Sequence, residues 1–170
     1  REGWKVGLVG RSRASLEETI HLAFSDRAAG RQDVSLRAYP CDIGNQPAIA
    51  QVASQITADL GDPSALINSA GTNIPRRSLD LLSTEDFDSL MQTNLHGAFY
   101  FVHAFLPALR RAGGGTIVNI LSDAGIIANA KAATAYVASK FGLRGLTQST
   151  NLEQRQHGDR ATELGGGDLV

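Results

Sequence analysis

The chain has 170 residues, a length typical of one domain, and its 42% hydrophobic and 19% charged residues exclude a disordered chain. Its formal net charge of −1 provides no basic excess for binding nucleic acid or an anionic membrane surface. The single cysteine, Cys41, excludes an internal disulfide and favours a reducing compartment, so we expect a cytoplasmic protein. The most apolar stretch, residues 98–106, is too short to span a membrane.

The first part of the chain alternates short strands with helices. Strands are expected in three short, largely apolar runs: residues 5–9, 35–39 and 65–67. Between the first two strands, Ser15 should cap a helix, with Glu18 completing a capping box. Asn45 should cap the next helix, which carries Pro47 in its first turn.

The second part continues the alternation with longer helices. Ser83 and Asp86 frame the start of a helix whose pattern runs on to Leu109. Asn94 lies inside that helix close to Gly97, and this predicts a kink because asparagine is unfavourable in a helix interior. A strand at 116–121, a loop from Ser122, a helix at about 134–156 and a strand at 160–164 follow.

This alternation predicts an α/β fold with a doubly wound parallel sheet in a single domain. Ligands of such folds bind at the carboxyl ends of the strands. The glycine-rich turn that normally opens a dinucleotide-binding fold is absent, since Gly3, Gly7 and Gly10 have the wrong spacing. We therefore expect one βα unit, roughly 30 residues, to be missing before Arg1.

The strongest chemical signal is Tyr136 followed by Lys140, which share one face of the expected helix. A tyrosine hydroxyl has an unperturbed pKa of about 10, and a nearby ammonium favours the phenolate, as general acid–base catalysis requires. Taken alone, the pair is more often a solvated surface contact. Ser122 ends a strand, where its hydroxyl could polarise a substrate oxygen, or it could be an ordinary turn serine.

Four short segments occur in a characteristic order along the chain. They are Asn68-Ser69-Ala70-Gly71, Asn94-Leu95-His96-Gly97, Ser122-Asp123-Ala124-Gly125 and Tyr136-Val137-Ala138-Ser139-Lys140. In this combination the chain resembles the short-chain dehydrogenase/reductase family over nearly its whole length. The resemblance implies a Rossmann-like domain over residues 1–170, incomplete at both ends, and an NAD(P)-dependent enzyme.

The resemblance also implies roles for individual residues. Tyr136 would exchange a proton with the substrate oxygen, while Lys140 would assist it and bind the nicotinamide ribose. Ser122 would orient the substrate oxygen, and Asn94 would support a water relay to Lys140. The adenosine part of the cofactor would meet Asp42, Ile43, Asn68, Ala70 and Gly71. The interval from Ser122 to Tyr136 is one residue longer than the commonest family spacing, which suggests a rearranged loop.

The segment after the first strand bears on the choice of cofactor. NAD-preferring sites place an acid near the end of the second strand of the fold to bind the ribose 2′-hydroxyl. Because one βα unit is expected to be missing before Arg1, the second strand of the fold corresponds to the first strand of this chain. Its end reads Gly10-Arg11-Ser12-Arg13, and arginine suits a 2′-phosphate. We therefore expect NADP(H) to be favoured over NAD(H), with Arg11 the main contact and Ser12 and Arg13 as helpers. The alternative is that these are ordinary exposed loop arginines.

The long helix indicates a partner, because it is apolar on nearly all sides. Its apolar residues are Leu95, Ala98, Phe99, Tyr100, Phe101, Val102, Ala104, Phe105 and Leu106. A second copy of the chain is the simplest cover, so a homodimer or homotetramer is expected. His96 and His103 share a helix face but have no third ligand in register, so no metal is expected.

We conclude from the sequence that the protein is a reductase or dehydrogenase acting on a ketone or secondary alcohol, with reduction favoured. The alternative from another class is a non-catalytic dinucleotide-sensing or binding protein on the same fold.

Overall fold

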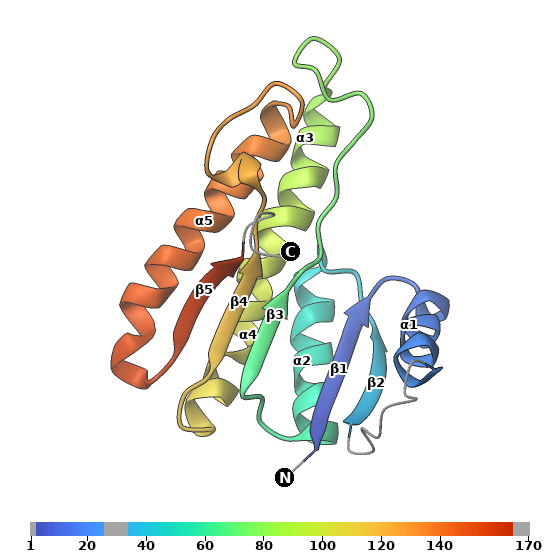
Figure 1. Ribbon diagram of the computed structural model, residues 1–170, viewed down its shortest axis with the longest axis vertical. Helices are drawn as coiled ribbons and strands as arrows, with labels where there is room; N and C mark the ends of the chain where they lie inside the picture. Colours follow the sequence, from blue (N-terminus) through green and yellow to red (C-terminus); the bar gives the residue numbers. More distant parts are fainter. Residues whose placement is uncertain (1–2, 26–33, 165–170) are drawn as a thin grey trace. The chain divides into compact units, whose positions relative to one another are not determined.

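A computed structural model describes residues 3–25 and 34–164 of the chain. It divides into two compact units, Arg1–Gly61 and Asp62–Val170. Strands and helices alternate along both units, and Figure 1 labels them in chain order. Every strand pairing in the described residues is parallel, as the alternation predicts.

The first unit contains a two-stranded sheet and two helices. Its elements are β1 (Trp4–Gly10), α1 (Arg13–Ser25), β2 (Val34–Pro40) and α2 (Gln46–Leu60). The register pairs Gly10 with Pro40, so the carboxyl ends of both strands lie at the same edge. Asn45 caps α2 by accepting a hydrogen bond from the amide of Ala48 at 3.1 Å, which confirms the predicted start of this helix.

The predicted start of α1 is wrong. The helix begins at Arg13, and the Ser12 hydroxyl accepts a hydrogen bond from the Ser15 amide at 3.2 Å. Ser12 therefore acts as the cap, three residues before the position expected from the sequence. Both serines fit the pattern of a capping residue, and the point where the chain leaves β1 decides between them.

The second unit contains a three-stranded sheet in the order β3-β4-β5. Its elements are β3 (Ala65–Asn68), α3 (Thr84–Met91), α4 (Gly97–Arg111), β4 (Thr116–Ile120), α5 (Thr134–Gln154) and β5 (Arg160–Leu164). All three strands were expected at these places, and Ser83 caps α3 as predicted, accepting from the Asp86 amide at 3.1 Å. The crossovers step in one direction along the sheet, so right-handed connections place α4 and α5 on the same face.

The core of the second unit holds α5 close to the preceding helices. Ala98, Leu121 and Leu143 form one buried cluster, against which Leu95 packs. A Cβ at Gly142 would lie 2.8 Å from a Leu95 methyl, so α5 approaches this region more closely than a larger residue would permit. This packing holds α5 against the helical segment that contains Leu95 and Ala98.

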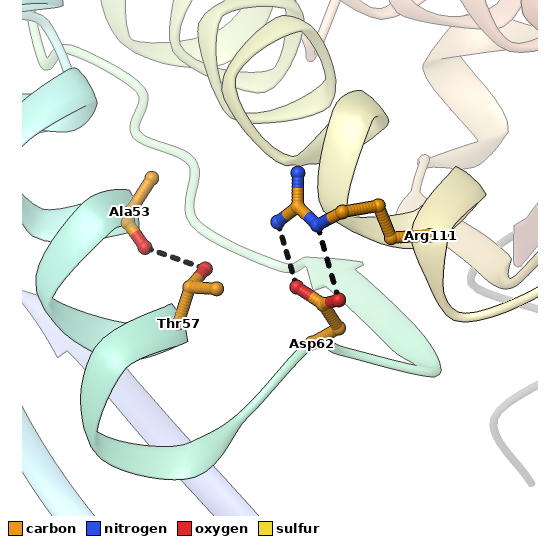
Figure 2. Close-up of polar contacts among 4 residues, drawn as sticks. All are labelled: Ala53, Thr57, Asp62 and Arg111. Atoms are coloured by element: carbon orange, nitrogen blue, oxygen red, sulfur yellow. Dashed lines mark hydrogen bonds and ion pairs between the residues drawn. The ribbon is translucent and has the colours of Figure 1, made fainter.

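An ion pair outside the core joins the end of α4 to the segment before β3. The Arg111 guanidinium donates from Nη2 to Asp62 Oδ1 at 2.7 Å and from Nε to Asp62 Oδ2 at 3.2 Å (Figure 2). This two-point contact raises the pKa of the Arg111 guanidinium. Because both groups are well exposed, the pair orients the chain here and contributes little to stability.

Candidate active site

A cavity of about 430 Å³ opens in the second unit at the carboxyl ends of β3 and β4. It is lined by residues following β3, the end of β4 and the first turns of α5: Ser69, Gly71, Thr72, Asn73, Ile120, Leu121, Tyr136 and Lys140. Its volume lies in the range of small-molecule sites. Its position is the one where parallel α/β sheets bind ligands.

Tyr136 and Lys140 project into this cavity from the first turns of α5. The Lys140 ammonium lies 5.7 Å from the centre of the Tyr136 ring and donates to the Ile120 carbonyl at 3.0 Å. The side chain of Lys140 is 4% exposed, and this burial lowers its pKa from the ordinary value. A buried ammonium beside a tyrosine at a cavity wall is suited to proton transfer.

Asn94 lies where the helix departs from α-helical geometry, at the position where the sequence predicts a kink. The helix changes there from α3 to a single π-helical turn, Gln92–His96, before α4 begins. The Asn94 side chain is 1% exposed, accepts from the Thr72 amide at 2.8 Å and donates to the Thr72 carbonyl at 2.9 Å. Asn94 therefore holds the cavity wall at Thr72 through both ends of its amide.

The same amide reaches α5. Asn94 Nδ2 also donates to the Ser139 hydroxyl at 3.2 Å, and that hydroxyl donates to the Tyr136 carbonyl at 2.8 Å. Ser139 is fully buried. The backbone at Tyr136 is thus tied through one serine to the π-helical turn.

Ser122 begins the short turn after β4 and lies beside α5 in the fold. It is half-buried, and its Oγ accepts from the Ala124 amide at 3.3 Å. A Cβ at Gly125 would lie 3.0 Å from the Lys140 carbonyl, so this turn packs directly on α5. Ser122 is not among the residues that line the cavity, although its neighbour Leu121 is.

The segment after β3 is divided between the cavity and the sheet. Gly71 lines the cavity, and a Cβ there would lie 3.5 Å from both Lys140 Nζ and Asn94 Oδ1. Asn68 instead donates to Asn119 on β4 at 2.8 Å, and Ala70 is exposed. Of the three residues expected to bind cofactor here, only Gly71 faces this cavity.

The remaining sequence candidates lie in the first unit at one edge of its sheet. Arg11 and Ser12 follow β1, and Asp42 and Ile43 follow β2. Because Gly10 pairs with Pro40, these segments leave the sheet side by side. Arg11 is exposed and Asp42 accepts from the Gly44 amide at 2.9 Å, while Ile43 is half-buried.

Several residues of the site were not singled out from the sequence. Thr72 and Asn73 directly follow the Asn68–Gly71 segment, and Ser139 lies inside the segment that contains Tyr136 and Lys140. Their nearness to the motifs was a usable signal. Their contacts with Asn94 and the cavity could not be expected, because these contacts join segments far apart in the chain.

Comparison with known proteins identifies the family of the chain. The family model for short chain dehydrogenases matches residues 1–167. The chain belongs to the short-chain dehydrogenase family. It is 37% identical over 153 residues to an uncharacterized oxidoreductase of Mycobacterium tuberculosis, covering 89% of this chain and 43% of that protein. It is 35% identical over 158 residues to the fatty acyl-CoA reductase of Acinetobacter baylyi, covering 91% of this chain and 50% of that protein.

A solved structure supports the same assignment for the fold. A metagenomic short-chain oxidoreductase in complex with NADP aligns with a TM-score of 0.84 and 30% identity, covering 95% of this chain and 70% of that one. The chain therefore has the Rossmann-like α/β fold of this family, and it spans about half the length of the two curated relatives above.

The described residues contain neither a helix that could span a membrane nor a cluster of metal-binding side chains. No helix in residues 3–25 and 34–164 combines the length and apolar content needed to cross a membrane. Within the same ranges, no three His, Cys, Asp or Glu side chains are grouped so that they could hold a metal ion.

Proposed function

We propose that the protein is an oxidoreductase that transfers a hydride between NADP(H) and a ketone or secondary alcohol, with reduction favoured. The observation that carries this proposal is the joint placement of Tyr136 and the buried Lys140 ammonium in the wall of one cavity. A protein that only bound the cofactor would need no acid–base group there. Family membership supports the nicotinamide cofactor, and one structural relative contains NADP.

The cavity suits the flat, polar end of such a cofactor. Gly71 leaves open a space next to Lys140 and Asn94 that a Cβ would fill. Thr72 and Asn73 add polar groups to the same wall, and Leu121 adds an apolar one. A cavity of this size into which several polar groups converge is suited to a small molecule.

In the mechanism we propose, the bound reduced nicotinamide supplies a hydride to the carbonyl carbon of the substrate. The Tyr136 hydroxyl donates its proton to the carbonyl oxygen, so the product is an alcohol and the tyrosine is left as a phenolate. The Lys140 ammonium stabilises that negative charge from the next turn of α5. Ser122, which directly follows the cavity-lining Leu121, is proposed to donate a hydrogen bond to a substrate oxygen at the rim of the cavity as charge develops there. Oxidation of the alcohol uses the same groups in reverse.

Arg11 and Ser12 are proposed to favour NADP(H) over NAD(H). Arg11 is exposed at the end of β1, and Ser12 caps the first turn of α1, where backbone amides favour an anion. Arg13 is paired with Glu17 at 3.6 Å, whereas no ion pair within the described residues involves Arg11. The cofactor 2′-phosphate would supply the partner for this guanidinium. Asp42 and Ile43 leave the sheet at the same edge and are proposed to meet the adenine.

We also propose that a second copy of the chain covers the outer face of α4 and α5, giving a homodimer or homotetramer. Phe99 on α4 is 45% exposed and Phe141 on α5 is 42% exposed. The Phe99 ring packs beside Tyr100 and His103, with centroids 5.9 Å apart in each case. Light scattering should show an oligomer that Phe99→Glu dissociates, and a monomeric wild type would contradict the proposal.

The single, buried thiol of Cys41 supports a cytoplasmic location.

The catalytic proposal is tested in the full-length protein by following NADPH oxidation with a panel of ketones. Tyr136→Phe should lower kcat by about 10²–10⁴-fold while leaving the Kd for NADPH unchanged. Tyr100→Phe is the matched control, because the Tyr100 hydroxyl accepts a hydrogen bond from Gln92 at 3.4 Å and does not line the cavity, so its loss should leave kcat unchanged. Retained turnover in Tyr136→Phe would remove this residue from the mechanism. NADPH binding without turnover of any ketone or alcohol would favour a non-catalytic binding protein.

Cofactor choice is tested separately by Arg11→Ala, which should weaken NADPH binding much more than NADH binding. Arg13→Ala is the control, since Arg13 already has Glu17 as its partner. Equal losses for both cofactors in Arg11→Ala would refute the assignment.

A further inference from the structure

A chain of buried hydrogen bonds crosses the second unit next to the cavity. The Asn68 side-chain amide donates to Asn119 Oδ1 at 2.8 Å, and Asn119 Nδ2 donates to the Thr147 hydroxyl at 2.8 Å. Thr147 in turn donates to the Leu143 carbonyl at 2.7 Å. This series of hydrogen bonds links the end of β3, the central strand β4 and α5.

The two inner members of this chain are nearly inaccessible to solvent. Asn119 is 1% exposed and Thr147 is 2% exposed. If either group is removed, the other loses a partner where water cannot replace it, which costs about 1–3 kcal/mol and favours a shift of α5 that restores a hydrogen bond. The contact between Asn119 and Thr147 therefore constrains how β4 and α5 sit together.

The placement of this contact relates it to Lys140. Thr147 follows Lys140 by seven residues, which is close to two helical turns, so both lie on the same face of α5. Lys140 donates to the carbonyl of Ile120, and Ile120 is the residue next to Asn119 on β4. Two consecutive residues of β4 thus contact α5 at points two helical turns apart. Asn119 binds Thr147 inside the unit, and Ile120 binds Lys140 at the cavity.

We propose that Asn119 and Thr147 are positioning residues that set the height and rotation of α5, and so place Lys140 and Tyr136 at the cavity. The inference rests on the proposed function for its catalytic consequence. Neither residue lines the cavity, so each acts through α5 and touches neither substrate nor cofactor.

The chain offers a matched control for the variant that tests this. Thr57 on α2 is half-buried, and its hydroxyl donates to the Ala53 carbonyl at 2.9 Å, four residues earlier (Figure 2). Thr147 makes the same local bond and accepts one more from Asn119. Thr147→Val and Thr57→Val therefore remove the same local interaction, and only the first removes the link to β4. Thr147→Ser keeps the hydroxyl and should restore the wild-type behaviour.

The experiment measures amide hydrogen exchange, kcat, KM and the pH profile of kcat in the full-length protein. Thr147→Val should raise exchange over residues 136–144 and lower kcat by about 10-fold or more, since small misplacements of catalytic groups are costly. Its pH profile should shift because Lys140 is displaced, while the KM for cofactor changes less than kcat. Thr57→Val and Thr147→Ser should match the wild type in all of these readouts.

The possible failures are distinguishable. If the wild type turns over ketones and Thr147→Val has the same kcat and pH profile as Thr57→Val, the positioning role is refuted and the proposed function stands. If exchange over residues 136–144 is unchanged in Thr147→Val, the anchor itself is refuted, whatever the activity. If exchange rises in Thr147→Val but the wild type turns over no substrate, the anchor stands and the proposed function fails.

Discussion

The residue just before α5 is strained, and relieving that strain should stabilise the protein. Ala133 has φ 66° and ψ 167°, a combination that is essentially confined to glycine because a Cβ crowds the backbone. It is the one described residue other than glycine with positive φ. It stands three positions before Tyr136, at the end of the loop that leads into α5.

The magnitude follows from two opposing terms. A residue held in such a conformation costs about 1–3 kcal/mol, which Ala133→Gly would recover. Glycine also gains freedom in the unfolded chain, which opposes folding by about 0.5–1 kcal/mol. The net expectation is a stabilisation of roughly 0–2.5 kcal/mol, and for a chain of this size each kcal/mol raises Tm by about 2–4 °C.

The assay is unfolding by denaturant and by heat, with Ala50→Gly as the matched control. Ala50 is exposed in the interior of α2, where glycine should cost about 1 kcal/mol because the helical backbone needs no positive φ. The two variants make the same chemical change and should move stability in opposite directions. If Ala133→Gly lowers the free energy of unfolding as Ala50→Gly does, the reasoning from backbone strain is refuted.

Three further predictions concern the cavity and the turns. Gly71→Ala should leave Tm unchanged, because the new methyl would make an ordinary 3.5 Å contact with Lys140. The same methyl would fill part of the cavity, so the Kd for NADPH should rise. An unchanged Kd would count against this cavity as the cofactor site. Burial lowers the pKa of Lys140 below 10.5, so between the folded and unfolded pKa values the unfolded chain binds more protons than the folded one. The stability of the wild type should therefore rise relative to that of Lys140→Met as the pH increases towards 10.5. A difference in the free energy of unfolding that does not change with pH would contradict this. Gly114→Ala should destabilise more than Gly113→Ala, since both have positive φ but only a Cβ at Gly114 would meet the Gly158 backbone, and equal losses of Tm would exclude that contact as the cause.

Much of the fold could be predicted because its signals are local. The caps at Asn45 and Ser83 depend on a side chain and an amide three residues later, and both formed as expected. An irregularity in the helix at Asn94 could be expected because asparagine is unfavourable in a helix interior, and the structure has a π-helical turn there. The start of α1 shows the limit of such signals, because Ser12 and Ser15 are equivalent as local capping residues and the exit from β1 selected Ser12.

The motifs around the candidate site were also visible in the sequence, but the sequence did not show which of their residues line the cavity and which pack inside the unit. Tyr136 and Lys140 share the cavity wall, whereas Asn68 turns to Asn119 inside the unit and Ser122 lies outside the lining. Short patterns give residue types and spacing. They do not say which way a side chain turns once a strand has ended, because that depends on its neighbours across the sheet.

What the sequence determined by itself is therefore the order of strands and helices, most of their caps, and the residue types brought to the carboxyl edge of the sheet. Tertiary structure alone decided the burial of Lys140, which lowers its pKa, and the contact of Thr147 with Asn119. The physical reason is the range of the interactions. Helix caps and turns act within a few residues, whereas desolvation and buried hydrogen bonds depend on segments that only the folded chain brings together.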